Sequence, residues 1–72
     1  MKLKWTHSQD IAERLYAEYP EQDPLEVRFT DLHNMVCKLT EFDDDPKQAN
    51  EAKLEAIQMA WLDEFRDEDD RD

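Results

Sequence analysis

The sequence predicts a mainly α-helical domain with three helices and at most short strands. Apolar residues recur at helical spacing in three segments of the chain, and proline-containing turns separate these segments. The 72 residues are enough for one small domain with a modest core. We assign residues 1–65 to this domain. Residues 66–72 contain five acidic and no apolar residues, which predicts a disordered acidic tail.

The first helix is expected at residues 7–18, after an N-terminal segment that alternates apolar and basic residues. That segment, 1–5, is typical of a short strand or a packed arm. Thr6 and Gln9 match a capping box, with Thr6 as the N-cap. Tyr19-Pro20 ends the helix. Its apolar stripe comprises Ile11, Leu15 and Tyr19, with Ala12 and Tyr16 beside them.

The second helix is expected at residues 31–40, with Thr30 as its N-cap. Before it, Asp23 is suited to bond nearby amides ahead of Pro24. Residues 25–29 alternate apolar and polar side chains, which predicts a brief strand. The apolar stripe of the second helix comprises Leu32, Met35, Val36 and Leu39.

The third helix is expected at residues 51–65, after an acidic turn at residues 41–46 and with Asn50 as its N-cap. Three consecutive aspartates beside Pro46 disfavour a helix, because Asp is a poor helix former and proline restricts the residue before it. Phe42 is expected to anchor this turn to the core. The third stripe comprises Leu54, Ile57, Trp61 and Phe65, widened by Met59 and Leu62.

Charge is the strongest feature of the composition. Nine basic and twenty acidic residues give a net charge of −11. This charge disfavours binding to nucleic acids and to anionic membranes, and it favours binding to cations and to basic protein surfaces. No apolar run is long enough to cross a membrane, no signal peptide is evident, and the single cysteine cannot form an internal disulfide. We therefore expect a cytoplasmic protein.

The acidic turn contains the main metal-ligand candidates. Asp43, Asp44 and Asp45 supply oxygen donors for a divalent cation, and Asp31 and Glu51 are further candidates. Consecutive side chains diverge, so the turn predicts a weak, exposed site that water or other carboxylates complete. The alternative is a solvated turn in which an aspartate caps a helix.

No arrangement of residues predicts catalysis, and we expect a protein that is not an enzyme. His7 and His33 lack the paired ligands of a zinc site, which favours structural roles, although a peripheral ligand role for His7 beside Asp10 stays open. Cys37 is expected at the edge of its helix stripe as a structural residue, because a negative surrounding field raises the pKa of a thiol.

Several motifs in order resemble one family. They are Leu3-Lys4-Trp5-Thr6, Tyr19-Pro20 with Asp23-Pro24, Val27-Arg28-Phe29-Thr30-Asp31, Phe42-Asp43-Asp44-Asp45-Pro46, Asn50-Glu51, Leu54-Glu55-Ala56-Ile57 and Trp61-Leu62-Asp63-Glu64. Over residues 2–65 the chain resembles the IscX (YfhJ) family of small acidic proteins of iron–sulfur cluster assembly. His7 and Ala49 depart from the family pattern, where an acidic residue and a serine are expected.

The resemblance implies a modified winged-helix fold and a monomeric adaptor or regulator. Such a protein binds ferrous iron weakly through surface carboxylates and binds a basic patch of the cysteine desulfurase IscS in competition with bacterial frataxin. It modulates sulfur transfer or donates iron, and the scaffold or ferredoxin of the pathway are possible further partners. The matching acidic positions are Asp23, Asp31, Asp43, Asp44, Asp45, Glu51, Asp63 and Glu64.

One alternative from another functional class is a winged-helix nucleic-acid-binding protein or a DNA mimic. The three expected helices are compatible with a helix-turn-helix arrangement. Direct DNA binding needs a basic helix, however, and the second helix offers only Lys38.

Overall fold

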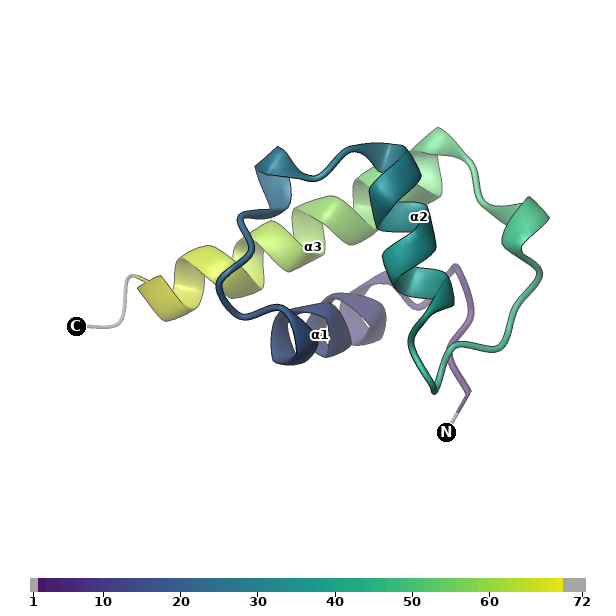
Figure 1. Cartoon of the computed structure of the whole chain (residues 1–72), viewed down its shortest axis with the longest axis horizontal. Helices are drawn as coiled ribbons and strands as arrows, with labels where there is room; N and C mark the ends of the chain where they lie inside the picture. The colour runs from purple at the N-terminus through teal and green to yellow at the C-terminus, as the bar shows by residue number, and fades with distance from the viewer. Residues whose placement is uncertain (1, 70–72) are drawn as a thin grey trace.

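The computed structural model describes residues 2–69, with the side chains of residues 2–66. It contains three α-helices, α1 (Ser8–Glu18), α2 (Phe29–Cys37) and α3 (Glu51–Asp69), and two short 3₁₀ helices, η1 (Pro24–Glu26) and η2 (Pro46–Gln48). The long helix α3 packs against α1, α2 and η1, and α2 crosses in front of it (Figure 1). The predicted mainly α-helical class with three helices is confirmed.

The core lies between the three α-helices and the N-terminal arm. Trp61 and Trp5 are its largest side chains, at 0% and 1% exposure. All three predicted stripes contribute to it, and each large apolar side chain buried in this way stabilises the fold by about 1.5–3 kcal/mol. The buried apolar residues are Leu3, Trp5, Ile11, Ala12, Leu15, Leu32, Val36, Leu39, Leu54, Ile57, Trp61 and Leu62. Met59 was wrongly placed in the third stripe, because it is 51% exposed.

The N-terminal arm is packed, as predicted. Leu3 is buried and forms an isolated parallel bridge with Phe42. Within residues 2–69, this bridge is the only strand-like pairing, so the described chain has no sheet of the kind that a winged helix contains.

Two of the three predicted α-helix N-caps are wrong. Helix α1 begins at Ser8 with His7 at the capping position, and neither Thr6 nor Gln9 caps it. Helix α2 begins at Phe29, so Thr30 lies inside its first turn rather than at the cap. The third prediction is confirmed, because Asn50 Oδ1 accepts a hydrogen bond from the Lys53 amide at 2.9 Å.

Residues 25–29 do not form the predicted strand. Pro24 suits the first position of a helix, and Asp23 Oδ1 accepts a hydrogen bond from the Leu25 amide at 3.0 Å, so a 3₁₀ turn forms instead. Gln58 of α3 then holds this turn through a 2.9 Å bond to the Pro24 carbonyl. Leu25, the first apolar residue of the alternating segment, is 56% exposed.

Two helix ends also differ from prediction. Helix α2 ends at Cys37 instead of Thr40, and its last carbonyls accept hydrogen bonds from the Lys38 and Leu39 amides. Helix α3 continues to Asp69, beyond the predicted end at Phe65. Residues 70–72 of the predicted acidic tail lie outside the described residues.

Candidate functional site

The acidic turn between α2 and η2 is fixed to the N-terminal arm by backbone hydrogen bonds. The Leu3 amide donates to the Glu41 carbonyl at 2.7 Å, and the Asp43 amide donates to the Leu3 carbonyl at 2.9 Å. Phe42, which lies between Glu41 and Asp43, is half-buried against the core as predicted. The path of the turn is therefore set by a segment about 40 residues earlier in the chain.

Trp5 is the main organiser of this turn. Its backbone amide donates to Asp44 Oδ2 at 3.0 Å, and its indole Nε1 donates to the Asp45 carbonyl at 2.7 Å. Its ring packs edge-on against Phe42, with the ring centroids 4.7 Å apart. The sequence predicted Trp5 only as a core residue, because helical periodicity gives no sign of contacts so far apart in the chain.

The carboxylate of Asp44 turns back onto the backbone. In addition to the Trp5 amide, it accepts a hydrogen bond from the Asp45 amide at 2.7 Å. These two bonds, and to a lesser extent the charges of Lys4 and Lys53, lower the pKa of Asp44 below its ordinary value. Asp44 is therefore held ionised, with its oxygens engaged inside the turn.

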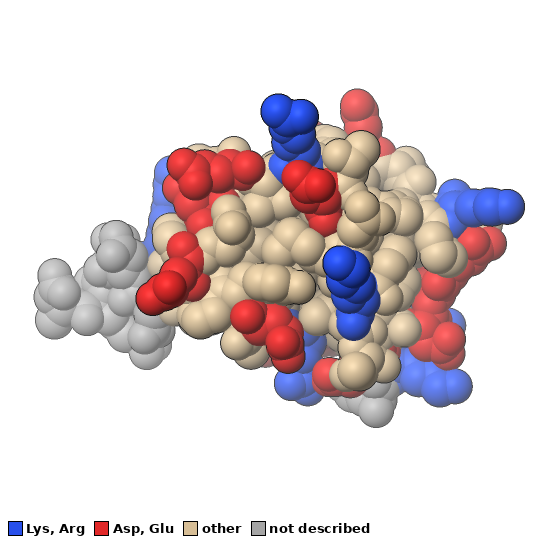
Figure 2. All heavy atoms as spheres, in the orientation of Figure 1, with Lys and Arg blue, Asp and Glu red and all other residues tan. Residues whose placement is uncertain are grey.

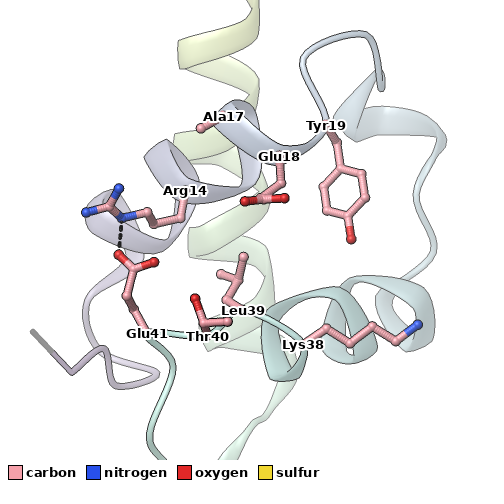
Figure 3. A pocket seen from close by; sticks show the side chains of 8 residues that line it. All are labelled: Arg14, Ala17, Glu18, Tyr19, Lys38, Leu39, Thr40 and Glu41. Atoms are coloured by element: carbon pink, nitrogen blue, oxygen red, sulfur yellow. Dashed lines mark ion pairs between the residues drawn. The ribbon is translucent and has the colours of Figure 1, made fainter.

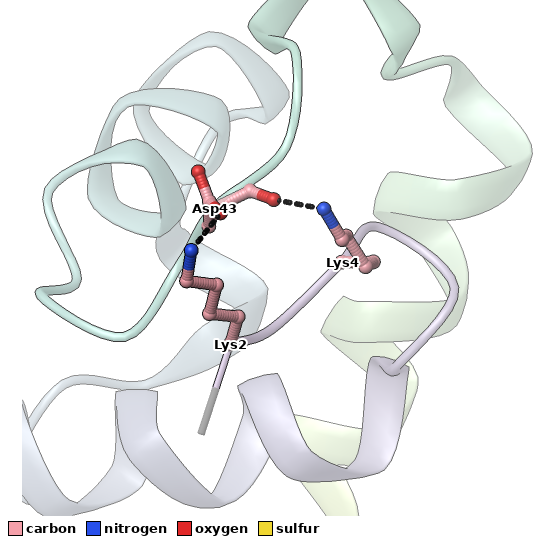
Figure 4. Close-up of polar contacts among 3 residues, drawn as sticks. All are labelled: Lys2, Lys4 and Asp43. Atoms are coloured by element: carbon pink, nitrogen blue, oxygen red, sulfur yellow. Dashed lines mark hydrogen bonds and ion pairs between the residues drawn. The ribbon is translucent and has the colours of Figure 1, made fainter.

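Asp43 points outward and lies beside two lysines (Figure 4). Its carboxylate pairs with Lys2 at 3.3 Å, while its carbonyl accepts a hydrogen bond from Lys4 Nζ at 2.6 Å. The two side chains of the ion pair are 77% and 57% exposed, so solvent and salt screen the attraction. Asp43 is the only one of the three aspartates whose carboxylate makes no bond to a backbone amide among the described residues.

Asp45 caps η2, because its Oδ1 accepts a hydrogen bond from the Lys47 amide at 2.9 Å. The three consecutive carboxylates thus diverge and contact different partners, as their consecutive spacing predicted. Within residues 2–66, no group of three or more His, Cys, Asp or Glu side chains is arranged to hold a metal ion. Asp31 and Glu51 lie in the first turns of α2 and α3, where they face the positive ends of the helix dipoles.

The eight acidic positions predicted to bind a partner fall into two groups. Five have partners within the domain: Asp23, Asp44 and Asp45 accept backbone amides, Asp43 pairs with Lys2, and Glu64 accepts from Gln9 Nε2 at 2.8 Å. The other three, Asp31, Glu51 and Asp63, are exposed. On the face in Figure 2, acidic side chains gather around the rim with basic side chains among them.

A small pocket of about 150 Å³ lies where the end of α1 meets the segment after α2 (Figure 3). Arg14 Nε pairs with Glu41 Oε2 at 2.6 Å on one side of it. Glu18 and Tyr19 lie on the other side, and the Lys38 side chain extends away along α2. This volume is below the roughly 300–1,000 Å³ of typical small-molecule sites.

The two histidines have local partners in the fold. His7 Nδ1 accepts a hydrogen bond from the Lys4 amide at 3.1 Å in the turn that precedes α1. His33 stacks on Trp5, and its Nε2 lies 2.8 Å from the Pro46 carbonyl oxygen, so it links α2 to η2. The structural role predicted for His33 thus includes a contact with the acidic turn that the sequence did not reveal.

Comparison with known proteins gives the family. The model of the iron–sulphur cluster assembly family matches residues 3–66. The chain belongs to this family. The matched range covers the whole described core and the acidic turn, and it confirms the IscX resemblance found in the motifs.

A relative in Pseudomonas aeruginosa aligns over almost its whole length with this IscX-family chain. It is 50% identical over 64 residues, which cover 89% of this chain and 97% of the relative, and it is described as an uncharacterized protein. The IscX family acts in iron–sulfur cluster assembly and is not a known enzyme family. Among the described residues, no helix has the length and apolar character needed to span a membrane.

Proposed function

We propose that this IscX-family protein is an acidic adaptor or regulator of cluster assembly that binds the cysteine desulfurase IscS and ferrous iron. The observation that carries the proposal is a net charge of −11 on a fold that keeps its acidic turn in one fixed conformation. Family membership gives the pathway, and the charge gives the kind of surface that the protein recognises.

Fixed carboxylates favour binding because little conformational freedom remains to be lost on association. The arm, including Trp5, already orders the turn through five hydrogen bonds, so its outward charge needs little further ordering. Attraction of this kind speeds association and weakens as salt increases. A basic patch on the desulfurase that also attracts bacterial frataxin makes the two proteins competitors, with the scaffold or ferredoxin as possible further partners.

Ferrous iron binds weakly in this proposal, through exposed carboxylates and water. The Asp43 side chain is 57% exposed and its carboxylate pairs only with the exposed Lys2 among the described residues, and Asp31 and Glu51 are further exposed candidates. Iron bound there changes the local charge of the docking surface, which links iron level to sulfur transfer or to iron delivery.

The structure indicates which carboxylates to change in a binding test. Reversing Asp44 or Asp45 removes bonds that shape the turn, so it tests folding as well as binding. Neutralising the three exposed positions with Asp31→Asn, Glu51→Gln and Asp63→Asn removes charge without breaking those bonds. The matched control neutralises Glu21, Glu26 and Glu55, which are also exposed, so both triple variants have the same net charge.

We expect the first triple variant to bind the desulfurase about threefold to 150-fold more weakly than wild type, at about 0.2–1 kcal/mol for each exposed charge. Calorimetry at low and moderate salt measures this, with circular dichroism to confirm folding. The control should lose clearly less affinity. Equal losses in the two variants would show that only net charge matters, and unchanged affinity in the first would remove these positions from the interface.

A further inference from the structure

His33 and Cys37 face each other one turn apart on α2. Cys37 Sγ lies 3.9 Å from His33 Nδ1, and both side chains are half-buried. The pair has no place in the proposed binding of the desulfurase, which rests on carboxylates. It combines an imidazole and a thiol, the two donors that most often bind zinc in proteins.

The tautomer of the neutral His33 ring is set by the hydrogen bond that Nε2 makes. His33 Nε2 lies 2.8 Å from the carbonyl oxygen of Pro46, and a carbonyl oxygen only accepts hydrogen bonds. Nε2 therefore carries the hydrogen in the neutral ring, and the lone pair of Nδ1 faces the thiol. Stacking on Trp5, with the ring centroids 5.3 Å apart and the planes 25° apart, fixes the orientation of the ring.

This is the arrangement that metal-binding histidines adopt. In such sites one ring nitrogen binds the metal, and the other donates its hydrogen to a carbonyl or carboxylate oxygen that orients the ring. A zinc ion at about 2.0 Å from nitrogen and about 2.3 Å from sulfur would bridge two atoms 3.9 Å apart at an angle of roughly 130°. That angle is close enough to tetrahedral that small side-chain rotations complete the geometry.

We propose that His33 Nδ1 and Cys37 Sγ form a two-ligand site for Zn²⁺, with the remaining positions taken by water or by donors of a partner protein. On binding, the Cys37 thiol gives its proton to solvent and the thiolate bonds to the metal. Within residues 2–66, no third His, Cys, Asp or Glu side chain joins the pair, so in this proposal the remaining ligands come from water or from outside the domain.

Solvent reaches the imidazole through an open groove between α2 and the start of α3. The groove is lined by Phe29, Thr30, His33, Asn34 and Leu54. The ligands lie outside the acidic turn, and Asp31, the one proposed ferrous-iron carboxylate on α2, is two residues from His33 and therefore does not share its helix face. Loss of one is therefore expected to leave the other intact.

Cobalt(II) is a spectroscopic probe for the site, because a cobalt–thiolate bond gives a charge-transfer absorption band in the near ultraviolet. We expect the full chain to develop this band on titration with Co²⁺ and to lose it when Zn²⁺ is added. Cys37→Ser should abolish the band. His33→Gln, whose amide can still reach the Pro46 carbonyl, should weaken Co²⁺ binding by more than about tenfold. Asp43→Asn, in the acidic turn, is the control and should keep the wild-type titration.

The proposal fails if the wild-type chain gives no thiolate band, if His33→Gln titrates like wild type, or if Asp43→Asn loses the band. Should His33→Gln be unfolded by circular dichroism, ¹⁵N signals of the wild-type imidazole decide the matter. Zinc should shift the Nδ1 signal and leave Nε2 protonated, and an unmoved Nδ1 signal would overturn the proposal.

Discussion

Replacing Trp5 by phenylalanine tests the central structural claim, that this residue holds the acidic turn in place. The change removes the 2.7 Å hydrogen bond from Nε1 to the Asp45 carbonyl, worth about 1 kcal/mol. It also leaves a cavity on the order of 40 Å³, which costs about 1 kcal/mol more at about 24 cal/mol per Å³. We expect the free energy of unfolding to fall by about 2 kcal/mol.

Trp61→Phe is the matched control. Trp61 is equally buried, but its indole Nε1 has no hydrogen-bond partner among the described residues. The same cavity forms, whereas removal of an unpaired buried N–H relieves a penalty of about 1–3 kcal/mol. Trp61→Phe should therefore be nearly neutral or stabilising, and the two variants should differ by at least about 2 kcal/mol.

Urea unfolding followed by far-ultraviolet circular dichroism measures both variants without relying on tryptophan fluorescence. For a domain of this size, a loss of about 2 kcal/mol lowers the melting temperature by roughly 8–16 °C. The Leu3 and Asp43 amides, which join arm and turn, should also exchange hydrogen faster in Trp5→Phe. The reasoning is refuted if Trp61→Phe destabilises the fold as much as Trp5→Phe does.

Two further predictions concern single carboxylate and amide groups. Because the folded-state pKa of Asp44 is lowered, its stabilising effect is complete above the ordinary value of 3.8 and is lost as pH falls through the lower folded value. Asp44→Asn should therefore make the free energy of unfolding less dependent on pH in the acidic range, as measured by unfolding at a series of acidic pH values. The same pH dependence in Asp44→Asn and wild type would contradict this prediction. Asn50→Ala should lower the free energy of unfolding by about 0.5–2 kcal/mol, because it removes the cap of α3, while Asn50→Asp should be nearly neutral. Equal melting temperatures for the two variants would show that Asn50 does not act as the cap.

The sequence predicted the helices well because apolar spacing reports directly which face is buried. Ile11 and Leu15, Leu32 and Val36, and Ile57 and Trp61 are all buried at the predicted positions. Periodicity predicts the face of a helix but fixes its ends less well. Thus α2 is shorter than predicted and α3 is longer.

Cap predictions succeeded where a side chain had a short local partner and failed where the preceding loop had another conformation. Asp23, Asp45 and Asn50 each accept an amide two or three residues later in the sequence. Thr6 instead lies in a turn closed by a hydrogen bond from the His7 amide to the Lys4 carbonyl. A capping motif is therefore only as reliable as the local geometry that the rest of the chain permits.

The acidic turn shows most clearly what sequence analysis lacked. The divergence of its three aspartates followed from their spacing, but their bonding partners did not, because Trp5 and Leu3 are about 40 residues away in the chain. Only the folded structure identifies Asp44 as the acceptor for the arm and Asp45 as the cap of η2. His33 and Cys37 are different, because their spacing of four residues places them on one helix face from sequence alone.

Consecutive aspartates are often taken as a sign of a metal site, yet this turn needs two of its three carboxylates for its own conformation. A carboxylate that accepts two backbone amides, as Asp44 does, must break those bonds or share its oxygens to bind a cation. Breaking the bond to the Trp5 amide would loosen the contact between the arm and the turn. A cation is therefore expected to bind carboxylates that accept no backbone amide. The charges available for recognition are then Asp43, Asp31, Glu51 and Asp63, and the bonded aspartates contribute by fixing where Asp43 points.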